Sequence, residues 1–378
     1  MANIEDYLIW RGDISFDVDP FNEIDNIILC ELCYTDFDGI VSGPENREDL
    51  ISIFDACEKF FEHHTDEEIM SQEASTKVAP FLMRQLIKTK RFKDLKLGAY
   101  INEIDPESQS QFSAITFYPG DDSVFCAFRG TDNTIVGWRE DFNMSFLNHT
   151  QGQQKAAEYL SWNFADCDKL LRVGGHSKGG NFAIYGSAFC DKKVSDKISI
   201  IYANDAPGFS EEILSMKEWE PIMPKIKRVI PAESIVGLLF KHDATDRIIQ
   251  SSNSGLMQHD IMSWEVLCNH LVECDSMSQK SLAISGTLKD WIKQLDYNTR
   301  EEFFDIVFES LFATGADTLQ ELNSNKKKNM KELRRMYSEL DKDTKKMVNG
   351  VISALAASGS DHFINNMKSK YEELIGKN

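Results

Sequence analysis

The stretch that decides the fold reads Leu170-Leu171-Arg172-Val173-Gly174-Gly175-His176-Ser177-Lys178-Gly179-Gly180. A short apolar run ends here in the pattern Gly-x-Ser-x-Gly, and helix-compatible apolar residues follow through residue 189. This order predicts a strand, a sharp turn with Ser177 at its apex, and a helix. Such a turn strains the serine backbone, and its flanking glycines leave room for the neighbouring strand and helix. Ser177 is therefore a candidate nucleophile at the positive end of a helix.

A second motif lies upstream, where the apolar run 123–128 breaks at Gly130 and Thr131 follows. A serine nucleophile needs two hydrogen-bond donors for the oxyanion of its tetrahedral intermediate. One donor is usually the backbone N–H of the next residue, here Lys178, and the other comes from a loop after an earlier strand. Thr131 is placed to offer both its backbone N–H and its hydroxyl. The predicted oxyanion donors are therefore Thr131 and Lys178.

These motifs together resemble those of the class 3 lipase branch of the α/β-hydrolases and, more closely, of the bacterial Mbeg-like family. The matching stretches are Phe128-Arg129-Gly130-Thr131, Trp138, Asp141, the segment 175–180, the N-terminal segments 3–13 and 21–25, and the segment 258–266. The resemblance covers about residues 1–270. It implies a hydrolase fold and a serine triad, and it implies no particular substrate.

The general base of such a triad is a histidine, which can accept and return a proton near neutral pH. The chain order serine, acid, histidine leaves four of the eight histidines, namely His242, His259, His270 and His362. His259 lies in a polar loop after the strand-like run 247–251, and the resemblance favours it as well. His270 falls in a pattern that predicts a helix over 264–271, and His362 lies in the C-terminal tail. We expect His259 to be the base, with His242 as the alternative.

The acid should follow a strand between the serine and the histidine. Glu233 ends a strand-like run at the place where the resemblance puts the acid, although the family usually has aspartate there. Asp205 is the main rival because it ends the strand-like run 198–203, and Asp243 and Asp246 are weaker ones. We expect Glu233 to orient His259.

Strand-like and helix-like patterns predict an α/β fold of the hydrolase type, with a mixed, mostly parallel central sheet. The predicted strands are 97–104, 112–118, 124–128, 170–174, 198–203, 226–230 and 247–251. A hairpin turn joins the second and third of these, and helices separate the later ones, as parallel strands require. We expect a hydrolase domain over 1–275 that begins with helices, and a helical C-terminal region over 276–378 packed on or beside it.

Composition limits the function classes. The net charge of −20 argues against nucleic acid and anionic membrane surfaces as partners. All of this net negative charge precedes residue 276, since residues 276–378 carry 16 Lys and Arg against 15 Asp and Glu. No window approaches the roughly 20 apolar residues of a membrane span, and the acidic N-terminus is unlike a secretory signal. Eight scattered cysteines are typical of reduced core residues, so we expect a cytoplasmic protein.

Two function classes remain. The leading one is a serine hydrolase acting on a small acyl ester or a lipid-like substrate, with no cofactor and no metal. The alternative is a non-catalytic interaction module that keeps a hydrolase fold. The Lys178 ammonium stands out, because the corresponding residue is usually apolar in class 3 lipases. We expect it either at the pocket rim, where it would favour anionic substrates, or in solvent on the outer face of its helix.

Overall fold

The computed structural model describes residues 2–349, apart from 72–75, 133, 145–146, 243, 295–296, 319–320, 322–325, 343 and 347. Residues 350–378 of the predicted helical C-terminal region lie outside the described residues. All eight cysteines are free thiols. No helix in the described part of the chain is long and apolar enough to cross a membrane.

Eight strands form one sheet, and they are arranged in the order in which the chain makes them. The strands are β1 (Ile51–Ser52), β2 (Lys96–Asp105), β3 (Ser110–Tyr118), β4 (Ser123–Phe128), β5 (Leu170–His176), β6 (Ile198–Asn204), β7 (Ile226–Pro231) and β8 (Asp246–Ile249). The pairs from β1 to β4 are antiparallel, and the pairs from β4 to β8 are parallel. The predicted α/β fold with a mixed sheet is confirmed.

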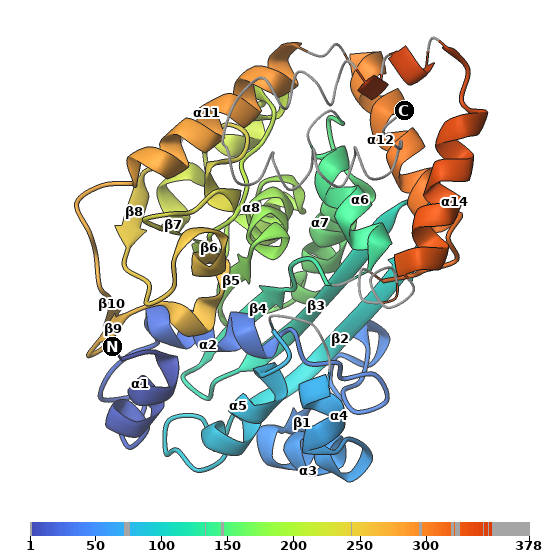
Figure 1. Ribbon diagram of the computed structural model, residues 1–378. Helices are drawn as coiled ribbons and strands as arrows, with labels where there is room; N and C mark the ends of the chain where they lie inside the picture. Colours follow the sequence, from blue (N-terminus) through green and yellow to red (C-terminus); the bar gives the residue numbers. More distant parts are fainter. Residues whose placement is uncertain are drawn as a thin grey trace.

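The helices surround this sheet (Figure 1). They are α1 (Ile4–Arg11), α2 (Glu23–Leu32), α3 (Ile53–His63), α4 (Asp66–Ser71), α5 (Ala79–Leu86), α6 (Ile135–Asn143), α7 (Gln151–Phe164), α8 (Lys178–Phe189), α9 (Lys192–Ser195), α10 (Glu211–Leu214), α11 (Gln279–Gln294), α12 (Tyr297–Phe312) and α14 (Lys326–Glu339). The N-terminal helices, in blue, lie together in Figure 1, and α11, α12 and α14 lie on the opposite side of the molecule.

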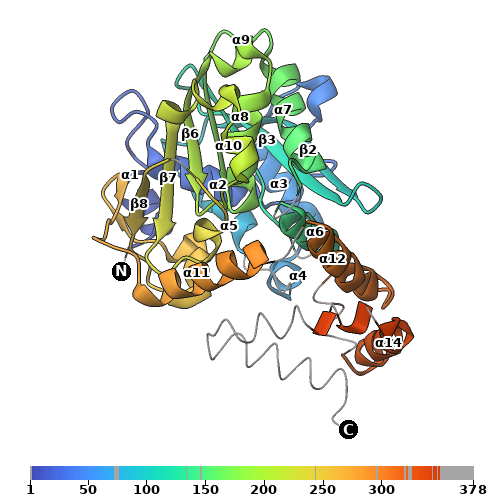
Figure 2. The ribbon, with the colours of Figure 1, turned by 90° about the horizontal axis from the view of Figure 1, so that it is seen from above.

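Each face of the sheet has its own apolar core. Successive side chains of a strand point to opposite faces, so Phe125 and Ala127 of β4 pack with helices α1, α2 and α5. Val124, Cys126 and Phe128 pack on the other face, with α7 and α8. Figure 2 shows α7 and α8 together beside the sheet, as right-handed crossovers between neighbouring parallel strands require. The strand ends that carry the candidate residues are therefore held from both sides.

Part of the helical tail packs on α6. The ring of Phe142 lies 4.8 Å from that of Phe304 and 5.7 Å from that of Phe308, both on α12. Beside them, Arg139 of α6 pairs with Asp305 at 2.5 Å. The domain boundary near residue 275 stays a prediction.

The helix predicted over 264–271 is wrong, because this segment contains the small antiparallel hairpin of β9 (Val266–Leu267) and β10 (His270–Leu271). Val266 and Leu271 are buried while Leu267 and His270 are exposed, which is the pattern of a half-buried ribbon. Cys268 makes the turn with a φ of 58°, without the glycine that usually marks such a position.

Candidate active site

Ser177 lies at the turn between β5 and α8, with backbone angles φ 58° and ψ −131°. A positive φ is costly for a residue with a side chain, so the surrounding packing must hold it. A Cβ at Gly175 would lie 2.2 Å from the backbone of Gly179, and a Cβ at Gly179 would lie 2.0 Å from the Phe128 carbonyl oxygen. The predicted strand, turn and helix are confirmed, and close backbone approach explains both glycines.

His259 ends the short 3₁₀ segment η5 (Gly255–His259). Its Nδ1 atom lies 2.6 Å from Oδ2 of Asp205, a fully buried carboxylate that directly follows β6. The other carboxylate oxygen accepts hydrogen bonds from the Ser234 hydroxyl and the Gly237 N–H. Because an ionised carboxylate only accepts, Nδ1 of His259 carries the proton, and Nε2 is left for a partner on the opposite side of the ring.

The prediction that Glu233 lies against this imidazole is wrong. Its carboxylate accepts a hydrogen bond from the Gly255 N–H, at the other end of the segment that carries His259. Its own N–H donates to the Gln258 side chain at 2.8 Å. Glu233 therefore holds the histidine segment, while Asp205 holds the histidine ring.

The strand order explains why Asp205 has this place. β6 is the direct neighbour of β5, and the Ser177 N–H donates to the carbonyl of Asn204, the last residue of β6, at 2.9 Å. The next residue is Asp205, which consequently sits beside the serine turn. Glu233 follows β7, which lies one strand further from β5 than β6 does. Neighbouring strands are about 4.8 Å apart. The sequence does contain a signal for this role, because Asp205 is the acidic residue directly after β6, the first strand that follows α8.

The other candidates lie elsewhere or outside the described residues. His242 faces Asp246, with Nε2 3.4 Å from Oδ2, and Asp246 is also paired with a buried arginine. His270 is exposed on the small hairpin. The candidates outside the described residues are Asp243 and His362.

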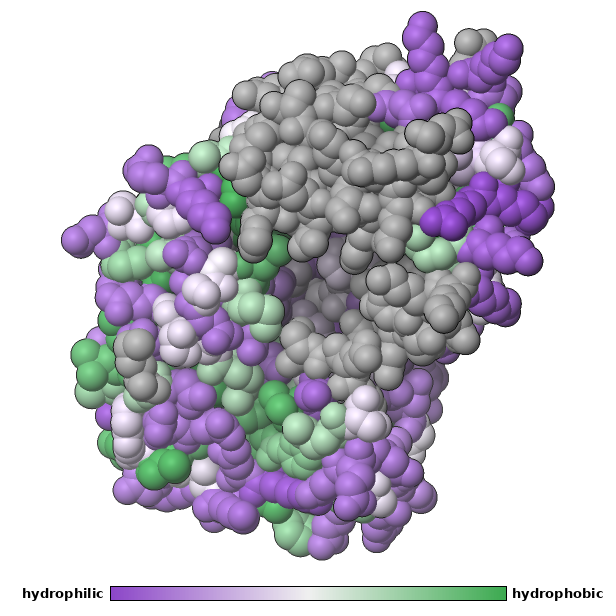
Figure 3. All heavy atoms as spheres, viewed as in Figure 1, coloured by the Kyte–Doolittle hydropathy of each residue, from purple (hydrophilic) through white to green (hydrophobic). Residues whose placement is uncertain are grey.

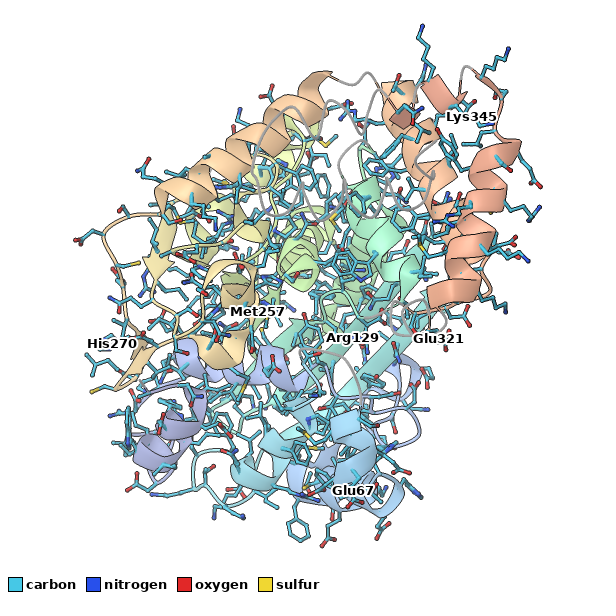
Figure 4. The ribbon with its side chains drawn as sticks, viewed as in Figure 1. Glu67, Arg129, Met257, His270, Glu321 and Lys345 are labelled. Carbon is cyan, nitrogen blue, oxygen red and sulfur yellow. The ribbon has the colours of Figure 1, made fainter. Side chains whose placement is uncertain are left out.

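The side chains of Ser177 and His259 are both partly exposed. Ser177 is half-buried, the His259 side chain is 28% exposed, and its ring stacks on that of His176 with centroids 4.4 Å apart. Figure 3 shows a hollow at the centre of one face, and Figure 4 labels Met257, on the segment that carries His259, in the same central region of that view. Neither Oγ of Ser177 nor Nε2 of His259 has a hydrogen-bond partner among the described residues.

The loop after β4 lies against the same turn. A Cβ at Gly130 would be 3.1 Å from Cβ of Ser177. Within the described chain, the backbone N–H groups of Thr131 and Lys178 have no acceptor. The Thr131 hydroxyl, however, donates to Oδ2 of Asp141 at 2.6 Å. Of the two donors expected from Thr131, the backbone N–H is the one that remains for a ligand.

The Lys178 side chain is neither at the rim nor in solvent, because it is almost completely buried. Its ammonium donates to the Glu140 carboxylate at 3.0 Å and to the carbonyl and side-chain oxygens of Gln111 at 3.1 and 2.8 Å. Three donors thus meet three acceptors. The same carboxylate accepts from the backbone N–H groups of Gln111 and Gly152, at 3.0 and 2.8 Å. This buried network joins β3, α6, α7 and α8.

Asp141, next to Glu140 on α6, is the titratable group behind the Thr131 loop. Burial raises the pKa of Asp141 to about 6, although the charge of Lys178 and the hydrogen bond from Thr131 act in the opposite direction. Among the described residues, no cluster of His, Cys, Asp and Glu could hold a metal ion.

Breaking the buried ion pair should cost much of the stability of the fold. We expect Lys178→Met to lower the free energy of unfolding by about 3–5 kcal/mol, since it leaves the Glu140 carboxylate buried without its cation. Lys192 pairs with Asp196 on the surface, so Lys192→Met is the matched control and should change little. Urea unfolding followed by tryptophan fluorescence compares the two. Equal losses in both variants would contradict the role of the network.

The raised pKa of Asp141 predicts a pH-dependent stability difference. Between about pH 4, the ordinary aspartate range, and pH 6 the folded state binds more protons than the unfolded state, so this group's contribution to stability falls as pH rises. In Asp141→Asn the amide does not titrate, and it can still accept from Thr131. The free energy of unfolding of this variant, relative to the original protein, should therefore rise from pH 4 to pH 7. Thermal unfolding across this range tests it, with Asp166→Asn, whose side chain is 80% exposed, as the control that should show no such rise.

Comparison with known proteins identifies a family for this chain. Among solved structures, the chain is similar to one described as the crystal structure of M37 lipase, with 15% identity and a TM-score of 0.31, over 47% of this chain and 64% of that one. No curated protein matches the sequence. The model of the Mbeg1-like family matches residues 86–309, more than half of the chain. The chain therefore belongs to the Mbeg1-like family, as its motifs predict.

Proposed function

We propose that this protein is a serine hydrolase that cleaves carboxylic esters through an acyl-enzyme on Ser177. The observation that carries the proposal is the hydrogen bond between His259 and a buried aspartate, beside a serine on a strained strand–helix turn. His259 is the general base, and Asp205 replaces Glu233 as the acid. The backbone N–H groups of Thr131 and Lys178 bind the oxyanion.

In this mechanism Nε2 of His259 takes the Ser177 proton as Oγ attacks the ester carbonyl. Asp205 keeps Nδ1 protonated and stabilises the imidazolium that forms. The alcohol leaves with the proton from Nε2, and a water activated by the same nitrogen then hydrolyses the acyl-enzyme. The Ser177–His259 hydrogen bond forms with substrate, since such bonds are often completed only in the Michaelis complex.

The side chains near His259 favour a substrate that has an apolar part. Leu256 and Met257, on the segment that ends at His259, are 51% and 59% exposed. Apolar side chains in this place suit the acyl or alcohol part of an uncharged ester. The buried ion pair of Lys178 removes the cation that would select anionic esters. The proposed substrates are therefore neutral acyl esters or lipid-like molecules.

Labelling of the nucleophile tests the proposal directly. A fluorophosphonate probe should label the intact protein, and Ser177→Ala should abolish labelling. His259→Ala should lower hydrolysis of 4-nitrophenyl butyrate by about 10⁴-fold or more. Ser108→Ala, at a distant surface turn, is the matched control and should label normally. If the intact protein does not react at all, the alternative of a non-catalytic interaction module is favoured.

The two acids are separated by isosteric variants. Asp205→Asn should lower kcat by about 10³–10⁴-fold, because an amide in this place favours the wrong tautomer of His259. Glu233→Gln should stay within about tenfold, since its amide oxygen can still accept from the Gly255 N–H. Steady-state kinetics of both variants decide between them. A larger loss for Glu233→Gln than for Asp205→Asn would reverse the assignment.

A further inference from the structure

His176, the residue before Ser177, is bonded at both of its ring nitrogens. Its Nε2 lies 2.9 Å from the backbone carbonyl oxygen of His259, and its Nδ1 lies 3.1 Å from the hydroxyl of Tyr34. The ring is 4% exposed and is enclosed by the rings of His259 and Trp264, with centroids 4.4 and 6.0 Å away. A polar side chain with this many directed contacts is fixed in one orientation.

The chemistry of the two partners fixes the tautomer of His176. A carbonyl oxygen only accepts, so Nε2 of His176 carries a proton and donates to His259. Burial lowers the pKa of His176 well below its usual range, so the ring is neutral and Nδ1 carries no proton. Nδ1 is then an acceptor, and Tyr34 donates to it. The Tyr34 phenol keeps its proton, since burial raises its pKa well above the usual range.

The hydrogen bonds from Tyr34 to His176 and from His176 to His259 connect the general base to β5, the strand that carries the nucleophile. His259 sits at the end of a five-residue 3₁₀ segment outside the main sheet, so no strand ladder holds its backbone. Asp205 holds its ring, and His176 holds its carbonyl. Because His176 and Ser177 are consecutive residues, any shift of β5 moves the serine and the histidine together. A misplacement of about 1 Å between such groups can cost 10²-fold in rate.

We propose that His176 is a positioning residue that aligns His259 with Ser177, and that the Tyr34 hydroxyl locks its tautomer. The proposal rests on the proposed hydrolase function for its kinetic consequences. Its structural claim, one tautomer donating from Nε2 and accepting at Nδ1, holds independently of any reaction.

The tautomer is measured first, on the full chain with ¹⁵N-labelled histidine. Two-bond ¹H–¹⁵N correlation spectra distinguish the two tautomers, and the signals of His176 are assigned by their loss in His176→Gln. We expect Nε2 protonated, and we expect the Nδ1 resonance in Tyr34→Phe to move toward that of an imidazole nitrogen without a hydrogen bond. A proton on Nδ1 of the intact protein, or no change in Tyr34→Phe, would overturn the inference.

Kinetics with 4-nitrophenyl butyrate then test the positioning. His176→Phe keeps an aromatic ring but removes the N–H donor, and it should lower kcat by about 10- to 100-fold with little change in KM. His176→Gln keeps an N–H at the corresponding place and should recover most of this loss. The kcat of Tyr34→Phe should lie between those of His176→Gln and the intact protein. The matched control is His270→Phe, on the exposed hairpin, which should behave as the intact protein does.

The outcomes separate the two proposals. Equal activity of the Phe and Gln variants, or a change confined to KM, would refute the positioning role while leaving Ser177 labelling intact. A wild-type protein with neither turnover nor labelling refutes the hydrolase function, and the tautomer measurement still decides the structural claim. If His176→Phe does not fold, as judged by thermal unfolding, Tyr34→Phe carries the kinetic test with an expected loss in kcat.

Discussion

The buried ion pair between Lys178 and Glu140 is the contact on which the candidate site depends. Two charges placed where water cannot reach them cost several kcal/mol each, and this cost is offset only when every donor and acceptor is matched. Here the ammonium has three acceptors, and the carboxylate has three donors from three different elements. The pair therefore anchors the first residue of α8. Ser177 directly precedes it, and the free backbone N–H of Lys178 moves with it.

The same helix that supplies Glu140 connects the site to the tail. Residues 140 and 141 of α6 face the network and the Thr131 loop, while Arg139 and Phe142 face α12. The family match also runs past residue 275 and ends within α12. Helix α6 is thus contacted on both sides, and the position of the Thr131 loop depends on residues that lie far along the chain from the serine motif.

Local patterns were enough to predict the serine turn and seven of the eight strands of the sheet, all except β1. These elements could be recognised because a strand or helix that buries one or both of its faces has apolar residues at a regular spacing in the sequence. The partner of His259 could not be found in this way. Asp205 and Glu233 both end strands, and only the order of those strands across the sheet, which no local pattern records, decides which carboxylate reaches the ring.

Two further features escaped sequence reasoning for similar reasons. A lysine reads as a surface residue, and the burial of Lys178 follows from acceptors on β3 and α6 that lie dozens of residues away. The turn at Cys268 lacks the usual glycine, so the sequence pattern predicts a helix where the structure has a hairpin. In both cases contacts distant in the sequence override the preference of a single residue.

Each of the five residues from Gly175 to Gly179 is constrained by its surroundings. Backbone of a neighbouring element excludes a side chain at either end, His176 is bonded on both sides, Ser177 carries a positive φ, and Lys178 is paired in the interior. The structure therefore restricts the choice of residue at every position of the pentapeptide. A change at 176 alone removes the partner of Tyr34 and of the His259 carbonyl. A change at 178 alone removes the cation that Gln111 and Glu140 bind, so distant pieces of the chain set which residues these two positions can hold.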